Sequence, residues 1–186
     1  MNKLKSVISC FLIVLGGECI ARSPNETLNG CIQEAAIFHQ VNEAILTSIL
    51  KVESSFRGDA INKNANGTMD VGIGQINSIH FKKLAQFNIT PGDLLDPCVG
   101  TYVSAWHLSK QIKSYGNTWF AVGAYHSVSP YFNNRYQRLV YNAMIDLKVL
   151  AGRKLPVPPM INQNTSKDSQ KSRLTKNESA IIAISH

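Results

Sequence analysis

The sequence is short of acidic residues, of cysteines and of long apolar runs. The 186 residues include 12 Asp and Glu and 19 Lys and Arg, which gives a formal net charge of +7. The excess is uneven, because residues 22–151 hold 11 basic and 9 acidic residues whereas residues 152–186 hold 6 and 2. The larger part is nearly neutral and contains no RNA- or DNA-binding motif, so we expect no nucleic-acid partner.

The one long apolar run, "VISCFLIVLGG", lies near the N-terminus and is too short for a confident membrane span. Lys3 and Lys5 precede it, and the small residues Cys19 and Ala21 follow it. This order is typical of a secretory signal cleaved after Ala21. We therefore predict that residues 1–21 are a signal peptide and that the protein is exported to the periplasm, with no stable membrane span after cleavage. An uncleaved anchor is the alternative.

Only four cysteines are present, and Cys10 and Cys19 would leave with the signal. Cys31 and Cys98 would remain, and two cysteines in an exported chain indicate one disulfide. Two separate buried thiols are the alternative.

No pair of histidines stands at ligand spacing from cysteines or acids, so we expect no metal site and no cofactor. The histidines considered are His39, His80, His107 and His126.

The chain has no internal repeat, and its pattern changes at Gly152. From there "GRKLPVPPMINQNTSKDSQKSRLTKNES" shows no hydrophobic period. We predict one folded domain over residues 22–151 and a basic, disordered tail over residues 152–186.

Helix signals dominate the folded part. Asn42, Asp96 with Pro97, and Thr118 are typical helix starts, and Gly116 is a typical stop. A last helix is indicated by apolar residues at spacings of four and three, namely Tyr136, Val140, Ala143, Leu147 and Leu150.

Residues 57–73 differ, because they are rich in Gly, Asn and Asp, with "NG" at 66–67. Strands and helices do not alternate, which argues against a parallel sheet. We predict an α+β fold that is mostly α, with one turn-rich or β excursion.

One carboxylate stands on an apolar helix face in "ILKVESSF", residues 49–56. Written as a helix, Ile45, Ile49, Glu53 and Phe56 share that face. Burial would raise the pKa of the Glu53 carboxyl and keep it protonated, as a donor to a glycosidic oxygen must be. The alternative is a helix-end glutamate tied to Arg57 or to backbone amides.

Two later segments favour the catalytic interpretation. "MDVGIGQIN" at 69–77 supplies Gly72 and Gly74 for close backbone approach. Its Gln75 and Asn77 can bond sugar hydroxyls and acetamides. "AVGAYH" at 121–126 then places a tyrosine and a histidine at a helix end.

Glu53-Ser54, "GIGQIN" and "AYH", in this order and at these distances, resemble the soluble lytic transglycosylase family. The resemblance covers Cys31 to Leu150. The small size, the export signal, "NGTMDVGIGQIN" and "DPC" look closest to the specialised enzymes encoded with type III and type IV secretion systems, conjugation machinery and type IV pili.

The resemblance implies a lysozyme-like fold and a peptidoglycan substrate. We expect a monomer that serves such an apparatus. The resemblance also implies cleavage of the β-1,4 bond between N-acetylmuramic acid and N-acetylglucosamine with a 1,6-anhydro product. Glu53 matches the family's acid. The residues that match its substrate-binding positions are Ser54, Gln75, Asn77, Tyr125, His126 and Tyr136. Core packing is the alternative for both tyrosines.

The sequence departs from the family's pattern at Gly74, where Met is usual, and at His126, where Asn is usual. We expect Gly74 to widen the floor of the substrate cleft and His126 to change the binding of an N-acetyl group.

Two other functions remain open. A lysozyme-type hydrolase would need a second carboxylate, for which Asp59 and Asp70 are candidates. A non-catalytic peptidoglycan-binding module is the third possibility.

Overall fold

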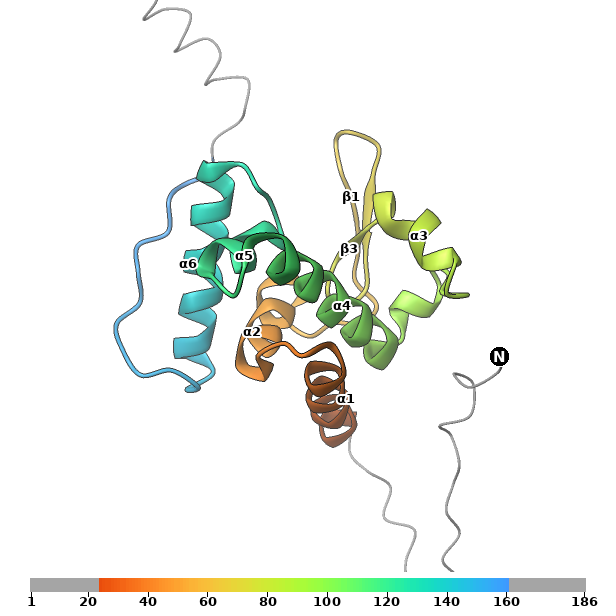
Figure 1. The fold of residues 1–186 in the computed structure, drawn as a ribbon, viewed down its shortest axis with the longest axis horizontal. Coiled ribbons are helices and arrows are strands. Elements are labelled where there is room, and N and C mark those ends of the chain that lie inside the picture. The colour runs from red at the N-terminus through yellow and green to blue at the C-terminus, as the bar shows by residue number, and fades with distance from the viewer. Residues whose placement is uncertain (1–23, 161–186) are drawn as a thin grey trace, which may run out of the picture.

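The computed structural model describes residues 24–160, which form six α-helices, two 3-10 turns and three short strands (Figure 1). The predicted signal peptide and residues 161–186 of the predicted tail lie outside the described residues. The helices are α1 (Pro24–His39), α2 (Glu43–Ser54), α3 (Phe81–Ala85), α4 (Pro97–Tyr115), α5 (Trp119–Ala124) and α6 (Pro130–Asp146). The strands are β1 (Ile61–Lys63), β2 (Met69–Val71) and β3 (Ile76–Asn77), and the 3-10 turns are η1 (Ser78–His80) and η2 (Asp93–Leu95).

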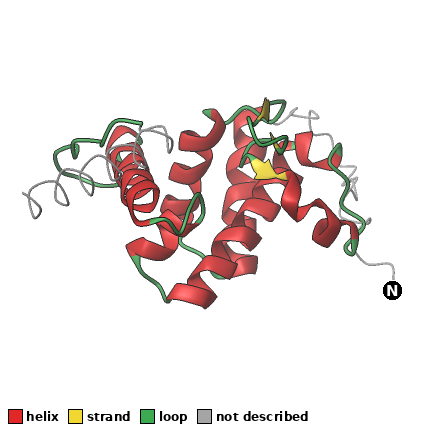
Figure 2. Cartoon of the chain, turned by 90° about the horizontal axis from the view of Figure 1, so that it is seen from above, coloured by secondary structure: helices red, strands yellow, loops and turns green. Residues whose placement is uncertain are grey.

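The helices pack around α4. Helix α1 lies on α4, α2 lies on α6, and α5 contacts both α4 and α6. Figure 2 shows the helices filling most of the molecule, with the small sheet confined to one part of it. The predicted α+β, mostly α class is confirmed.

The predicted caps are confirmed. Oδ1 of Asn42 accepts from the Ile45 amide at 3.0 Å, and Oγ1 of Thr118 accepts from the Ala121 amide at 3.2 Å. Oδ1 of Asp96 accepts from the Cys98 and Val99 amides at 2.8 and 3.0 Å. These side chains satisfy amides that the first helical turn leaves free.

The end of the last helix was predicted too late. Helix α6 ends at Asp146, so Leu147 and Leu150 lie beyond it. Lys148 has a φ of +59°, a left-handed conformation that breaks the helix, and the apolar spacing alone does not reveal this break.

The three strands form an antiparallel sheet in the order β1-β2-β3. Asp70 stands opposite Asn62 on one side and Asn77 on the other. Gly67, at φ +82°, closes the turn between β1 and β2 by donating its amide to the Asn64 carbonyl at 3.0 Å. The hairpin predicted within residues 57–73 is confirmed.

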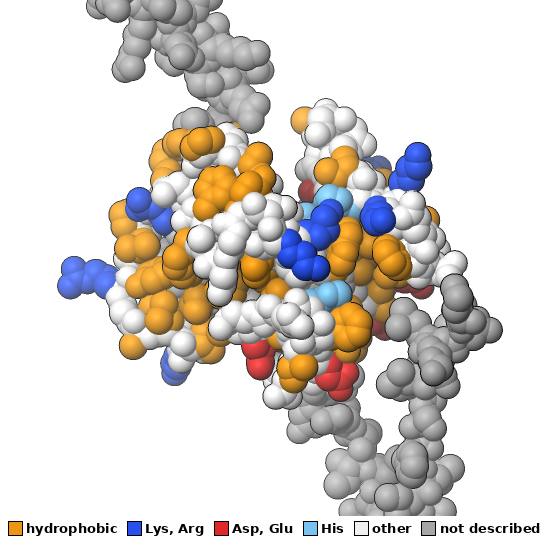
Figure 3. Space-filling view, viewed as in Figure 1, with side chains coloured by type: hydrophobic (Ala, Val, Ile, Leu, Met, Phe, Trp, Pro, Cys, Tyr) orange, Lys and Arg blue, Asp and Glu red, His pale blue; other side chains and the backbone are white. Residues whose placement is uncertain are grey.

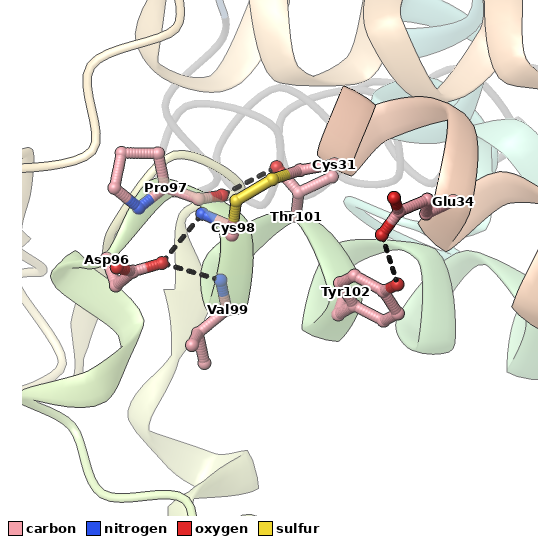
Figure 4. Close-up of a disulfide and its surroundings, with 8 residues drawn as sticks. All are labelled: Cys31, Glu34, Asp96, Pro97, Cys98, Val99, Thr101 and Tyr102. Atoms are coloured by element: carbon pink, nitrogen blue, oxygen red, sulfur yellow. Dashed lines mark hydrogen bonds between the residues drawn. A yellow bond between two sulfur atoms is a disulfide. The ribbon is translucent and has the colours of Figure 1, made fainter. Parts of the chain in front are cut away.

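A disulfide joins Cys31 of α1 to Cys98 in the first turn of α4, so the alternative of two thiols is wrong (Figure 4). The two Cα atoms are 5.3 Å apart across 67 residues of sequence. Nearby, the Tyr102 hydroxyl donates to Oε2 of Glu34 at 3.3 Å. The bond fixes α1 against α4.

Residues 152–160, which we name the strap, do not behave as the disordered tail that the sequence predicted. They run along α6 from its C-terminal end to its N-terminal end (Figure 1). Pro156, Pro158 and Pro159 restrict the strap's backbone and leave its carbonyls free to accept hydrogen bonds from α6. The prediction missed the strap because these bonds form only in the folded chain.

Among residues 24–160, no helix combines the length and the apolar character needed to cross a membrane.

Candidate active site

Helix α2 places Glu53 at the border between core and solvent. Leu46, Ile49 and Leu50 are fully buried against the other helices, while Glu53, one residue before the helix end, is half-buried. The structure therefore places the Glu53 carboxylate beside the apolar face of α2, as the sequence pattern predicted. Arg57, the alternative partner of Glu53, instead donates from Nε to the Ser54 carbonyl at 3.1 Å.

The chain turns sharply after Glu53. Ser55 and Phe56 have φ values of +55° and +66°, although neither is glycine. The Ser55 amide donates to the carbonyls of Leu50 and Lys51, which closes the helix. This turn directs the chain from α2 into the sheet, so that Glu53 lies where helices and sheet meet.

The Glu53 carboxyl accepts a hydrogen bond from the hydroxyl of Tyr136 on α6. Burial is the main cause that raises the pKa of Glu53 to about 7. The Tyr136 bond opposes this rise, and the negative charge of Asp70 adds to it. Near neutral pH, a large fraction of Glu53 is therefore protonated and able to donate a proton.

Two stacked tyrosines lie beside Glu53. The rings of Tyr125 and Tyr136 are 6.3 Å apart between centroids and nearly parallel, and both residues are buried. The Tyr125 hydroxyl donates to the Gly74 carbonyl at 2.8 Å. Burial raises the pKa of both hydroxyls, which keeps them neutral donors. Both tyrosines thus belong to the core, and Tyr136 also contacts the acid.

His126 covers the outer side of this stack. Its ring lies 5.1 Å from the Tyr136 ring between centroids, at an interplanar angle of 7°, and the residue is exposed. Partial burial and the charge of Arg135 lower the pKa of His126, and Asp70 opposes them. A neutral imidazole at this position can donate or accept a hydrogen bond.

Ser54 has a different environment from the one that the family resemblance implied. Its hydroxyl is buried and donates to the Ile73 carbonyl at 2.8 Å. The residue therefore ties the end of α2 to the loop between β2 and β3.

The side-chain amides of Gln75 and Asn77 form hydrogen bonds with other residues of the protein. Gln75, at φ +48°, donates from Nε2 to the Gly72 carbonyl at 2.8 Å and accepts from Asn62 at 2.6 Å. Asn77 donates from Nδ2 to Oδ1 of Asp70 at 2.7 Å, and its Oδ1 accepts from the Ile79 amide at 3.1 Å. Both residues shape the sheet side of the site.

Asp70 connects this sheet network to Glu53. Its Oδ1 accepts from Asn77, and its Oδ2 accepts from Nδ2 of Asn64 at 2.8 Å. These bonds hold a carboxylate whose charge acts on Glu53 and on His126. Asp59, the other acidic candidate, is exposed.

Gly74 has no room for a side chain. A Cβ there would overlap Oγ of Ser104 on α4 and approach the Tyr125 hydroxyl to 2.9 Å. The expected opening of the floor at this glycine is therefore not found, because Ser104 occupies the space. Sequence reasoning missed Ser104, whose position on an interior helix gave no signal of this contact.

The residues around Glu53 come from the helices and from the sheet. Figure 3 shows the surface recessed between the part formed by α5 and α6 and the β1–β2 hairpin. The charge of Asp70, on the sheet side, acts across to Glu53 and His126. Within residues 24–160, no three His, Cys, Asp or Glu side chains converge as metal ligands would.

The profile of the "Transglycosylase SLT domain" family matches residues 30–145, which include every residue of this site. The chain belongs to this family. Its fold is accordingly the lysozyme-like fold of SLT domains, as predicted.

Among characterised proteins, this SLT domain is similar to invasion protein IagB of Salmonella typhimurium strain SL1344, with 38% identity over 106 residues. That match covers 56% of this chain and 66% of the relative. IagB of Salmonella typhi is 34% identical over 69% of this chain and 84% of its own length. Protein IpgF of Shigella flexneri is 31% identical over 76% of this chain and 86% of its own length.

Proposed function

We propose that this SLT domain is a peptidoglycan lytic transglycosylase with Glu53 as its catalytic acid. One observation carries the proposal: Glu53 is half-buried, bonded to Tyr136, and has a pKa raised to about 7. General acid catalysis is most effective when the acid's pKa lies near the working pH. The bond cleaved would be the β-1,4 bond of peptidoglycan between N-acetylmuramic acid and N-acetylglucosamine.

In the proposed reaction, the Glu53 O–H gives its proton to the bridging oxygen as the bond from that oxygen to the muramoyl C1 breaks. The muramoyl C6 hydroxyl then attacks C1, and its proton passes to the Glu53 carboxylate. A C1–O6 bond replaces the glycosidic bond, so the product is a 1,6-anhydro sugar and no water is consumed. The protonated Glu53 is restored for the next cycle.

The neighbours of Glu53 have supporting parts in this proposal. Tyr136 orients the carboxyl group, and Asp70 favours its protonated form. His126 is exposed at the edge of the stack, where it can contact an N-acetyl group. The side chains of Tyr125, Ser54 and Gln75 donate to backbone carbonyls around the site. Asn77 donates to the Asp70 carboxylate.

The hydrolase alternative depends on Asp70, an acidic side chain whose charge acts on Glu53. A hydrolase needs a second carboxylate to position water or attack the sugar. Each Asp70 oxygen accepts one side-chain amide, from Asn64 or from Asn77, and retains a further lone pair. The Asp70→Asn variant in the experiment below separates the two reactions.

The deciding experiment is mass spectrometry of muropeptides released from purified peptidoglycan, with Glu53→Gln and Asp70→Asn as variants. We expect anhydro products, lighter than hydrolytic ones by one water, which Glu53→Gln abolishes. Asp70→Asn should keep the anhydro product, with circular dichroism as the folding control. Reducing-end products that disappear in Asp70→Asn would establish the hydrolase instead. Pelleting with peptidoglycan without any product would establish a wall-binding module.

We further propose that residues 1–21 direct export and that the enzyme opens the wall locally for a secretion, conjugation or pilus apparatus. The disulfide is consistent with an oxidising compartment. The name of the IagB relatives, invasion protein, supports an apparatus of this kind. A signal-sequence deletion that leaves the protein in the periplasm would contradict the export proposal.

A further inference from the structure

The strap is bonded to one face of α6, the helix that carries Tyr136. Four side chains of this face donate to strap carbonyls: Tyr131 to Pro159 at 2.7 Å, Arg135 to Pro158 at 3.0 Å, Arg138 to Pro156 at 2.9 Å and Asn142 to Leu155 at 2.8 Å. The Leu155 amide donates back to Asn142 at 2.8 Å. The strap lies beyond residues 30–145, which the family profile matches, so the shared fold does not account for it.

Arg135 is the strap contact that lies next to the site. It precedes Tyr136 in the sequence, and consecutive side chains of a helix point about 100° apart. Helix α6 therefore presents Arg135 to the strap and Tyr136 to Glu53. The Arg135 charge also reaches His126, which stacks on the Tyr136 ring.

These contacts form one connected series from the strap to the acid. The Pro158 carbonyl accepts from Arg135, and the charge of Arg135 acts on His126. His126 stacks on Tyr136, and Tyr136 donates to Glu53. We propose that the strap is a positioning element for Glu53, which acts by holding Arg135 beside the His126–Tyr136 stack. The proposal rests on the proposed function only in treating Glu53 as the acid.

The charges around His126 determine the direction of the expected effect. Arg135 of α6 disfavours the imidazolium, whereas Asp70 of β2 favours it. Burial also lowers the pKa of His126, and this cause remains without Arg135. Loss of Arg135 therefore raises the pKa of His126 and increases the positive fraction of the ring beside Tyr136 at a given pH. A nearby cation favours an ionised carboxylate, so the pKa of Glu53 falls. Arg135 and the strap thus keep Glu53 protonated to higher pH.

The test compares Arg135→Gln with Arg138→Gln in the full chain. Both variants lose an arginine and one strap hydrogen bond, but only Arg135 acts on His126. The Glu53 carboxyl and the His126 ring are titrated by NMR with isotope-labelled Glu and His. We expect Arg135→Gln to raise the His126 midpoint and to lower the Glu53 midpoint, and Arg138→Gln to leave both unchanged.

A third variant tests the strap itself. Replacing Pro156, Pro158 and Pro159 by Gly leaves every accepting carbonyl in place but loosens the strap. We expect it to shift both midpoints in the same directions as Arg135→Gln, by less.

An unchanged Glu53 midpoint in Arg135→Gln would overturn the proposal, and so would equal shifts in the two arginine variants. The titration needs no substrate, so its result does not depend on the proposed reaction. Wild-type protein that releases no muropeptides would refute the reaction alone.

Discussion

The hydroxyl of Tyr136 donates a hydrogen bond to Oε1 of Glu53, across 83 residues of sequence. The bond stabilises the ionised carboxylate, whereas burial stabilises the protonated acid, and burial has the larger effect. The pKa of about 7 is the balance of these opposed influences together with the charge of Asp70.

Removing the tyrosine hydroxyl should move this balance. In Tyr136→Phe we expect the pKa of Glu53 to rise above 7, because the bond that lowers it is lost. The decline of kcat at alkaline pH should therefore shift to higher pH. The maximal rate should fall by about tenfold or more, since the carboxyl loses its orienting partner. Tyr141→Phe, on the same helix but against Trp119, is the control. A shift to lower pH would contradict the assigned balance.

Ionisation of Glu53 should also lower the free energy of unfolding at alkaline pH. The pKa of Glu53 is about 7 in the folded protein and 4.5 as the reference value, so the folded state binds the proton more tightly. The stability that protonated Glu53 contributes is therefore fully present below pH 4.5 and is lost as the pH rises from there through 7. Glu53→Gln does not titrate, and should be more stable than wild type at pH 8 by roughly 1–3 kcal/mol. At pH 4 the difference should vanish. Urea unfolding at both pH values measures it, and a pH-independent difference would contradict the raised pKa.

The disulfide should contribute substantially to the free energy of unfolding. It closes a loop of 67 residues, and the loop-entropy estimate for that length is about 4 kcal/mol. Cys31→Ser with Cys98→Ser should lower the midpoint of thermal unfolding, and a reducing agent should lower that of the wild type by a similar amount. The reducing agent should leave the double variant unchanged, which separates the disulfide from other effects. Equal midpoints for all samples would show that the bond contributes little.

The left-handed Ser55 offers a stabilising substitution. A residue with a Cβ is strained at φ +55°, and glycine is not. Ser55→Gly should therefore raise the free energy of unfolding by up to about 1 kcal/mol. Ser48→Gly, inside α2, should instead lower it. A loss of stability in Ser55→Gly would indicate that the serine side chain has a role that the backbone geometry does not explain.

Local signals made much of the fold predictable. Asn42, Asp96 and Thr118 each cap a helix through an amide no more than three residues away, so their sequence context contains the whole interaction. The turn at Gly67 is equally local. The left-handed Lys148 that ends α6 had no such signal, because neither glycine nor proline marks it.

The site residues that belong to family motifs could be predicted from the sequence. Contacts between residues far apart in the sequence could not. Glu53 on its apolar face was visible in the sequence, and the family pattern pointed to Tyr136. The Ser54 contact with the Ile73 carbonyl spans 19 residues, so the sequence around Ser54 gave no sign of it. The strap's partners on α6 resemble ordinary polar surface residues until the chain folds back upon them.

The hydrogen bond from Tyr125 to the Gly74 carbonyl spans 51 residues and joins the helical side of the site to the sheet side. Both partners are buried, and Ser104 fills the space beside Gly74, so water has no easy route to replace this bond. Movement of the helical side relative to the sheet side would have to break this hydrogen bond without a water molecule to replace it. The polar groups around Glu53 are thus fixed before any ligand binds, and little binding free energy is needed to reorganise them.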